Sequence, residues 1–438
     1  MGFVLALLAV IAFVWLGVSD TRGGGPPLVG FPFEIIDARS NLATNGPAST
    51  EASTVSIFPV MDHGKWVCVR TANDAAERGD STRYFYDTGS RRFVAKLVPY
   101  QTAKNGVCHP ELSSPLQLDR VIVRQVRVDQ FKLLAWYKPW AARYDSYFYE
   151  LDVATSKTRF LAHHKESGAA LLGRTGLPNR GHTHMVYADN ESPRLEFVIF
   201  DLRDGSSRAL KRRHFGMSQG HTLRPWGWLA DDRTILFLED WSTSTLLPPG
   251  FVVENLHLVD VQTKKGPRNV APAERFKESM AKGKLAPGED TLLACLLLTD
   301  RDGGRRLRLV AAFGADGATS VAEQARWSVW DLDRETERLT RVMDLPLGLI
   351  RHHAEVGSPS GDTIVSALPP EPRGGMPLAD AVVYRVGQPP LRLPFKLYKH
   401  CWGLPDDHTL VYTNGRDEIW RFDLRTSQSE LLWSPSTR

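Results

Sequence analysis

The chain has 438 residues, of which 42% are hydrophobic and 24% charged. This balance excludes a largely disordered chain, because disorder requires low hydrophobicity together with high net charge. The 54 basic and 50 acidic residues leave a formal net charge of only +4, so charge predicts no nucleic-acid partner and no general attraction to a membrane surface. The length suits two or three ordinary domains, or one large repeat fold.

An uninterrupted apolar run, Phe3 to Val18, lies near the N-terminus and carries no charge. As a helix it would span about 24 Å, short of the hydrocarbon core of about 30 Å. Gly17-Val18-Ser19 fits the small-x-small site that ends a secretory signal, but no Lys or Arg precedes the run. Three interpretations remain open: a retained membrane anchor, which we favour, a cleaved signal, or an ordinary core helix.

These features predict three regions. Residues 1–22 form an N-terminal hydrophobic helix that serves as signal or anchor, and residues 23–50, which begin GGGPP, form a linker. Residues 51–438 form the main domain. We therefore expect a membrane-anchored or exported protein whose main domain is extracytoplasmic.

In the main domain, a tight polar turn repeatedly leads into an apolar strand. Asp, Asn and Gly suit such turns, because their short side chains bond the turn backbone or tolerate positive φ. The motif occurs as 62-DHGKWVCVRTA-72, 129-DQFKLLAWYK-138, 179-NRGHTHMVYAD-189, 231-DDRTILFLED-240, 288-GEDTLLACLL-297, 360-SGDTIVSAL-368 and 406-DDHTLVYTN-414.

A second motif is a strand ending in Asp, a short polar turn and a returning strand. We expect the Asp to accept backbone N–H groups of that turn and so to fix the hairpin. The motif occurs as 84-YFYDTGSRRFVAKL-97, 148-FYELDVATSKTRFL-161, 197-FVIFDLRDGSSRAL-210, 256-LHLVDVQTKKGPRNV-270, 329-VWDLDRETERLTRV-342 and 420-WRFDLRTSQSELL-432, and 383-VYRVGQPPLRL-393 is a copy without the Asp.

The two motifs alternate without exception, seven copies of each. Seven four-stranded units predict an all-β fold, a seven-bladed β-propeller; a pair of β-sandwiches is the alternative. Ala273 to Lys284 is the one segment with helical periodicity. Because the last unit finishes near Trp433, we expect ring closure to place Phe33 to Ala38 or Thr54 to Val60 beside it.

The repeat, including Trp228 in 226-WGWLADDRTILFLED-240 and Trp402 in 402-WGLPDDHTLVYTN-414, resembles the TolB-type propeller repeat. The same repeat occurs in the propellers of dipeptidyl-peptidase-IV-like proteins. The resemblance covers about Ser53 to Trp433 and implies a fold rather than a chemistry.

Three longer insertions interrupt the units, at Pro99 to Leu118, Trp241 to Glu254 and Arg301 to Arg326. Loops on a rigid scaffold often carry binding surfaces, although insertions also accumulate without function.

Gly216-Met217-Ser218-Gln219-Gly220 matches the G-x-S-x-G pattern of serine hydrolases. A nucleophile elbow needs a strand before it and a helix after it. Here 211-KRRHF-215 precedes the motif and the first strand of a unit follows it. We therefore interpret Ser218 as a loop residue and expect no catalysis from it.

Several of the thirteen histidines lie just before or at the start of a unit's first strand. First strands line the axis of a propeller, so His221, His353 and His400 could meet at one mouth of the channel and bind a divalent transition metal. Oligogalacturonate lyases are propellers that hold a metal with such histidines, and His221 and His400, each closely followed by Trp, resemble them loosely. Polar lining of the channel is the plainer interpretation, which we favour.

Two further features have structural interpretations. The basic cluster Arg208, Lys211, Arg212, Arg213 and His214 falls on a unit's last strand, where charge discourages edge pairing. The four cysteines lack zinc-site spacing and are too few for a disulfide framework. We expect them to be isolated buried thiols.

The sequence thus favours a non-catalytic, monomeric binding scaffold without a cofactor, whose partner is a protein or a small ligand at the channel mouth. The alternative is a metal-assisted enzyme acting on a polysaccharide or similar anionic substrate.

Overall fold

A computed structural model gives the fold. It describes residues 33–47, 53–73, 82–97, 111–112, 120–129, 143–152, 155, 157–167, 177–179, 181–189, 196–204, 206–216, 221–241, 253–263, 265–314, 326–345, 357–367, 378–398, 402–414 and 418–435. Phe3 to Val18 lies outside these stretches, so the N-terminal helix stays a prediction. No helix within them is long and apolar enough to cross a membrane.

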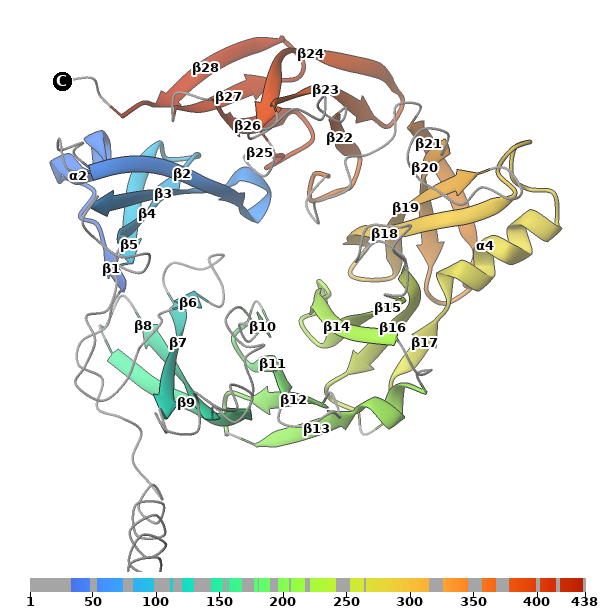
Figure 1. The fold of residues 1–438 in the computed structure, drawn as a ribbon, viewed down its shortest axis with the longest axis horizontal. Coiled ribbons are helices and arrows are strands. Elements are labelled where there is room, and N and C mark those ends of the chain that lie inside the picture. The colour runs from blue at the N-terminus through green and yellow to red at the C-terminus, as the bar shows by residue number, and fades with distance from the viewer. Residues whose placement is uncertain are drawn as a thin grey trace, which may run out of the picture.

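The described strands form seven antiparallel sheets arranged around a central axis (Figure 1), so the fold is an all-β propeller, as the sequence predicts. We number the sheets 1 to 7 in chain order. Sheet 1 contains β1 (Phe33–Ile35), β2 (Ser53–Met61), β3 (Trp66–Asn73), β4 (Thr82–Asp87) and β5 (Arg92–Leu97), in the order β1-β5-β4-β3-β2.

Sheets 2 to 7 each order their strands as in the sequence. Sheet 2 contains β6 (Glu111–Leu112), β7 (Arg120–Asp129), β8 (Arg143–Asp152) and β9 (Lys157–Ser167); sheet 3 contains β10 (Leu177–Pro178), β11 (His184–Asp189), β12 (Glu196–Asp201) and β13 (Ser207–Lys211); sheet 4 contains β14 (His221–Trp228), β15 (Thr234–Trp241), β16 (Val253–Asp260) and β17 (Arg268–Val270). Sheet 5 contains β18 (Thr291–Arg301), β19 (Arg306–Gly314), β20 (Arg326–Asp333) and β21 (Leu339–Leu345); sheet 6 contains β22 (Thr363–Ala367), β23 (Leu378–Arg385) and β24 (Gln388–Tyr398); sheet 7 contains β25 (Trp402–Gly403), β26 (Thr409–Thr413), β27 (Ile419–Asp423) and β28 (Gln428–Trp433).

The aspartate of the second motif caps its hairpin as predicted. Asp87 Oδ1 accepts from Gly89 N at 2.9 Å, Asp260 Oδ1 from Gln262 N at 2.9 Å, and Asp423 Oδ1 from Arg425 N at 2.7 Å. In sheet 6, where Arg385 replaces the Asp, the turn is shorter and uses Gly387 at φ +72°.

The two turns of a sheet are hydrogen-bonded to each other. We count β2 as the first strand of sheet 1 and β22 as the second strand of sheet 6. The residue that follows the third strand then donates its N–H to a carbonyl of the turn before the second strand. The pairs are Thr88 to Lys65, Leu202 to Thr183, Val261 to Arg233, Arg334 to Arg305, Val386 to Asp362 and Leu424 to His408. Both turns therefore lie at one edge of the ring, which we call the turn edge. The opposite edge, reached by the connection between second and third strands, is the insertion edge.

Sheets 2 and 5 correct the predicted strand positions. In sheet 2, Asp129 ends β7 instead of starting a turn into the second strand, and the predicted insertion before it contains β6. In sheet 5, the turn at residues 288–290 leads into the first strand β18, and the second strand β19 lies inside the predicted insertion Arg301 to Arg326.

Two helices pack on the sheets. α4 (Pro272–Ala281) confirms the predicted helix; it begins with Pro at N1 and buries Phe276. α2 (Asn41–Asn45) was not predicted, since the sequence indicated a linker there. Ser40 caps α2 by accepting from Ala43 N.

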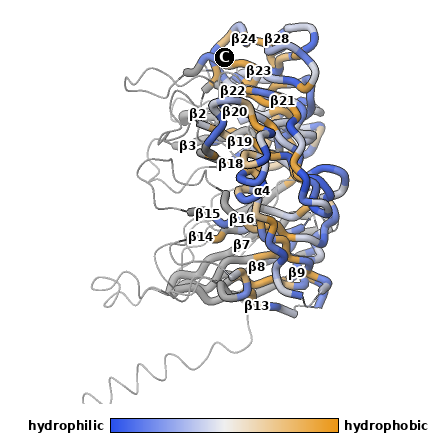
Figure 2. Tube along the Cα trace, turned by 90° about the vertical axis from the view of Figure 1, so that its right-hand side faces the viewer, coloured by the Kyte–Doolittle hydropathy of each residue, from blue (hydrophilic) through white to orange (hydrophobic). Residues whose placement is uncertain are grey.

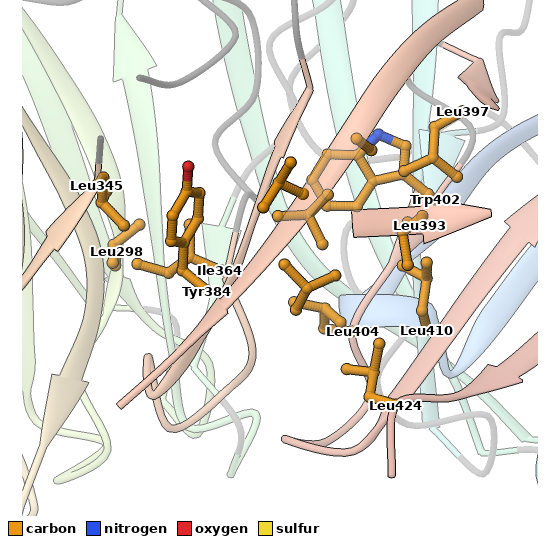
Figure 3. Close-up of a cluster of buried hydrophobic side chains, with 14 of the residues drawn as sticks. Leu298, Leu345, Ile364, Tyr384, Leu393, Leu397, Trp402, Leu404, Leu410 and Leu424 are labelled. Atoms are coloured by element: carbon orange, nitrogen blue, oxygen red, sulfur yellow. The ribbon is translucent and has the colours of Figure 1, made fainter. Parts of the chain in front are cut away.

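Apolar side chains between neighbouring sheets form the core. In Figure 3, Leu298 and Leu345 of sheet 5 lie beside Ile364 and Tyr384 of sheet 6, in a cluster that continues to Trp402 of sheet 7. Further clusters join sheets 2 and 3, 3 and 4, 4 and 5, and 7 and 1. Figure 2 shows the ring from the side: hydrophobic residues lie along the strands, and hydrophilic residues gather in the turns at one edge.

The predicted closure of the ring is confirmed in position but not in strand pairing. Ile36 packs in one cluster with Trp433, and β2 lies against β25 and β26. β1 pairs with β5 at the outer edge of sheet 1, with Ile35 opposite Ala95, and not with a strand of sheet 7. β2 likewise pairs with β3 of its own sheet. Sheet 1 and sheet 7 therefore each contain strands from one continuous part of the chain, with no strand exchanged between them.

Two of the four cysteines are described, and both are free and buried, as predicted. Burial raises the pKa of Cys68 to about 11 and that of Cys295 to about 12. Their thiols are therefore protonated and unreactive at neutral pH.

Candidate functional site

The structure does not describe the side chains of the three predicted metal ligands, so it does not place them relative to one another. His221 is the first residue of β14 and its backbone pairs with Trp241, but its side chain lies outside the description. His353 and His400 lie outside the described stretches altogether. Within those stretches, no group of three or more His, Cys, Asp or Glu residues is arranged to hold a metal. The metal site therefore stays a prediction.

The G-x-S-x-G segment is only partly described, and Ser218 is outside the description. Its flanks are a 3-10 turn, Arg212–Phe215, on the N-terminal side and the strand β14 on the other. A nucleophile elbow has the opposite context, a strand followed by a helix. The described flanks therefore favour the interpretation of Ser218 as a loop residue.

Arg208 and Lys211 of the basic cluster lie on β13, the last strand of sheet 3, as predicted. Arg212, Arg213 and His214 lie in the 3-10 turn that follows, not on the strand. The first member of the cluster, Arg208, reaches sheet 4 and donates from Nη1 to Thr263 O at 2.5 Å. Burial lowers the pKa of Arg208. This arginine joins two sheets, which is a structural role.

A buried ionisable cluster that sequence reasoning missed lies in sheet 4. His257 Nε2 is 2.7 Å from Glu239 Oε2, and Asn255 Nδ2 donates to the same oxygen at 2.9 Å. The ring of Phe215 packs edge-on against His257, with centroids 5.3 Å apart. Glu239 is 2% exposed and His257 1%.

The Glu239–His257 pair lies near His221, one of the predicted metal ligands. Glu239 pairs with Leu223 on β14, two residues along the strand from the His221–Trp241 pair. The pair is therefore near the insertion edge, but its burial keeps substrate away. A polar residue within each apolar run, Glu239 in one strand and His257 in the next, was the only signal in the sequence.

A second cluster joins sheets 2 and 3. Glu150 on β8 accepts from Arg159 Nη2 at 2.7 Å, and its other oxygen lies 3.6 Å from His182 Nδ1. His182 belongs to the turn before β11, has a left-handed backbone at φ +50°, and is 2% exposed. The contact fixes that turn of sheet 3 against the third strand of sheet 2.

A third cluster joins sheets 5 and 6. Arg308 on β19 donates through Nε and Nη2 to the two carboxylate oxygens of Asp331, at 2.7 and 2.9 Å. Its Nη1 also bonds Asp362, in the turn before β22. Burial alone would lower the pKa of Arg308, but the hydrogen bonds to Asp331 and Asp362 outweigh it, and the pKa is raised. Here too, buried charges join neighbouring sheets.

Taken together, these three described clusters hold strands and sheets in place. The central groups of each cluster are buried and make the contacts described above, whereas the side chains of Arg159 and Asp362 are 48% and 33% exposed.

Comparison with known proteins finds likeness only among solved structures. No family profile matches the chain, and no curated protein matches it. An oligogalacturonate lyase from Vibrio parahaemolyticus is 12% identical, with 90% of this chain and 98% of the other covered, at a TM-score of 0.49. The propeller domain of the Trilobed protease from Pyrococcus furiosus is 11% identical, with 89% and 98% covered, at 0.45. TolB from Acinetobacter baumannii is 11% identical, with 86% and 78% covered, at 0.34. These likenesses transfer no residue role to this chain.

Proposed function

We propose that the chain is a non-catalytic seven-bladed β-propeller that binds a protein or a small ligand at one mouth of its channel. An N-terminal segment would tether or export it. The observation that carries the proposal is the use of its buried ionisable groups. Glu239–His257, Glu150–His182 and Arg308–Asp331 are all engaged inside or between sheets. Seven sheets in chain order support the count of blades.

The insertion edge is the candidate binding surface. The strand ends that flank the insertion Trp241 to Glu254 meet there, since Asp240 pairs with both Thr222 and Val253. The turn edge, by contrast, consists of short hydrogen-bonded turns that carry ion pairs within a sheet, such as Arg203 with Asp201, and between sheets, such as Arg301 with Asp362. Long loops on a rigid scaffold offer more adaptable contact surface than such turns.

Site-specific photo-crosslinking tests the proposal in cells that express the full chain. A photoreactive residue at Thr245, in the insertion, should give a discrete crosslinked species. The same residue at Arg425, an exposed position on the turn edge, is the matched control and should not. Equal crosslinking from both positions would contradict the assignment of the surface.

An activity assay tests whether the protein lacks catalytic activity. Purified protein with Mn²⁺ or Zn²⁺ should leave anionic polysaccharides intact. Cleavage that requires the metal and disappears in His400→Ala would overturn the proposal and favour the metal-assisted alternative.

A further inference from the structure

One junction in the ring differs from the others, because the chain does not run directly across it. Sheet 1 is built from residues 33–97 and sheet 7 from residues 402–433. Every other pair of neighbouring sheets is consecutive in the chain. Among the described strands, no ladder pairs a strand of sheet 1 with one of sheet 7. We call this junction the seam; side-chain contacts hold it.

The outer part of the seam is closed by the segment that precedes β2. Trp433 Nε1 donates to Asn45 O at 3.1 Å, and its ring packs edge-on against Phe93 at 5.3 Å. Gly46, at φ +74°, allows this approach, since a Cβ there would lie 2.4 Å from Phe93. Tyr86 Oη adds a bond to Leu432 O at 2.8 Å. We call these contacts the rim latch.

The segment of the rim latch is itself fixed to sheet 1. β1 pairs with β5, and Ile36 N donates to Val94 O at 2.9 Å. α2 then places Asn45 under the indole of Trp433. The rim latch thus connects β28, the last strand of sheet 7, with β5 of sheet 1.

The inner part of the seam is closed by the turn between β2 and β3, the 3-10 turn Asp62–Gly64. His63 Nδ1 donates to Gly357 O of sheet 6 at 3.0 Å, so the contact reaches past sheet 7. Gly64 lies so close to sheet 7 that a Cβ there would be 2.9 Å from Pro405. His63 holds a left-handed backbone at φ +53°, a conformation that costs a non-glycine residue energy. We call this contact the axis latch.

We propose that the seam between sheets 1 and 7 opens reversibly as one unit, and that the rim latch and the axis latch hold it closed. Local opening follows the regions whose contacts are easiest to break. At the seam, opening breaks side-chain packing and a few hydrogen bonds, and leaves every ladder intact. Elsewhere in the ring, the chain that joins consecutive sheets limits their separation.

Hydrogen exchange of the full-length protein, followed by mass spectrometry, tests the proposal. Trp433→Phe keeps the packing of an aromatic ring and removes only the indole donor of the rim latch. His63→Gly removes the axis latch and permits positive φ. A single hydrogen bond contributes about 0.5–1.5 kcal/mol, so each variant should raise exchange at the seam roughly two- to tenfold. Trp433→Phe should also accelerate exchange in the turn Asp62–Gly64, and His63→Gly should also accelerate exchange in α2, because no ladder holds either short segment.

Trp228→Phe is the matched control. It removes an equivalent indole bond, Trp228 Nε1 to Leu177 O at 2.7 Å, between the consecutive sheets 3 and 4. The control should leave exchange at the seam unchanged. Acceleration confined to the peptide that carries each substitution would overturn the proposal, as would equal acceleration of sheets 3 and 4 in the control. Should Trp433→Phe fail to fold, His63→Gly gives the same test with the rim latch intact.

Discussion

Aspartates at the turn edge have the clearest residue-scale role. Asp201 ends β12, caps the following turn through Arg203 N, and bonds the guanidinium of the same arginine. The hydrogen bond from Arg203 lowers the pKa of Asp201 to about 2. Sequence reasoning predicted the backbone cap from the position of the Asp alone, because the requirement is local. The arginine partner was not predicted, since exposed side chains leave little trace in a repeat pattern.

The lowered pKa predicts how stability depends on pH. The folded pKa of Asp201 lies below the unfolded value of about 3.9, so its contribution is complete above about pH 4 and is lost as pH falls toward about 2. Asp201→Asn should lower the free energy of unfolding at pH 7 by about 1 kcal/mol, because the exposed partner Arg203 is screened by solvent. Urea unfolding at pH 7 and pH 2.5 checks this: the deficit should shrink at the lower pH. A deficit that is the same at both would contradict the assignment.

The buried pair of sheet 4 shows the limit of sequence reasoning at this scale. His257 and Glu239 are eighteen residues apart, and only the register of β15 against β16 brings them together. A lone polar residue in an apolar run does not reveal its partner, because strand register is set by non-local packing.

At the scale of strands and helices, local sequence patterns predicted the positions of turns better than the place of each strand within its sheet. The turn 406-DDH-408 does lead into the second strand β26, as predicted. In sheet 5, residues 288–290 and Asp302-Gly303-Gly304 are both turns, and both precede apolar strands. Choosing between them requires knowing which strand pairs with β20. The short helix α2 was missed because it is not long enough to show a period, whereas β1 lies within the early strand expected at Phe33 to Ala38.

Contacts between sheets yield a prediction at the same scale. Arg308→Met should lower the free energy of unfolding by about 3 kcal/mol, because it removes both hydrogen bonds to the buried carboxylate of Asp331 and leaves only the more distant Arg306, at 3.8 Å, as its cation. The Asp331 side chain is 10% exposed and that of Arg308 3%. Urea unfolding at pH 7 measures the loss.

Arg425→Met is the matched control for this substitution. Arg425 pairs with Asp423 at 3.4 Å, and its side chain is 64% exposed. Exposed pairs contribute less than about 1 kcal/mol. If the two variants lose equal stability, Arg308 does not hold sheets 5 and 6 together as described.

For the whole molecule, the repeat predicts the propeller because each unit buries its faces only against its neighbours. Ring closure lies beyond such reasoning, since it concerns the one junction that the repeat does not contain. The sequence predicted an early strand beside sheet 7. Phe33–Ile35 extends sheet 1, and the segment after it meets sheet 7 through Asn45, whose carbonyl accepts from the indole of Trp433. Figure 1 shows α2 near the C-terminal end of the chain.

Two truncations separate the tether from the rim latch. Removal of residues 1–32 deletes the apolar segment and keeps β1 and α2. We expect this protein to be released from membranes by a carbonate wash that retains the full chain, with an unchanged Tm. Removal of residues 1–46 also deletes Ile36 and Ala43, which are buried against sheet 1 and Trp433. Burying one such aliphatic side chain contributes about 1.5–3 kcal/mol, so Tm should fall by several degrees, as thermal unfolding would show. If both truncations unfold at the same temperature, residues 33–46 are only a linker and the rim latch does not close the ring.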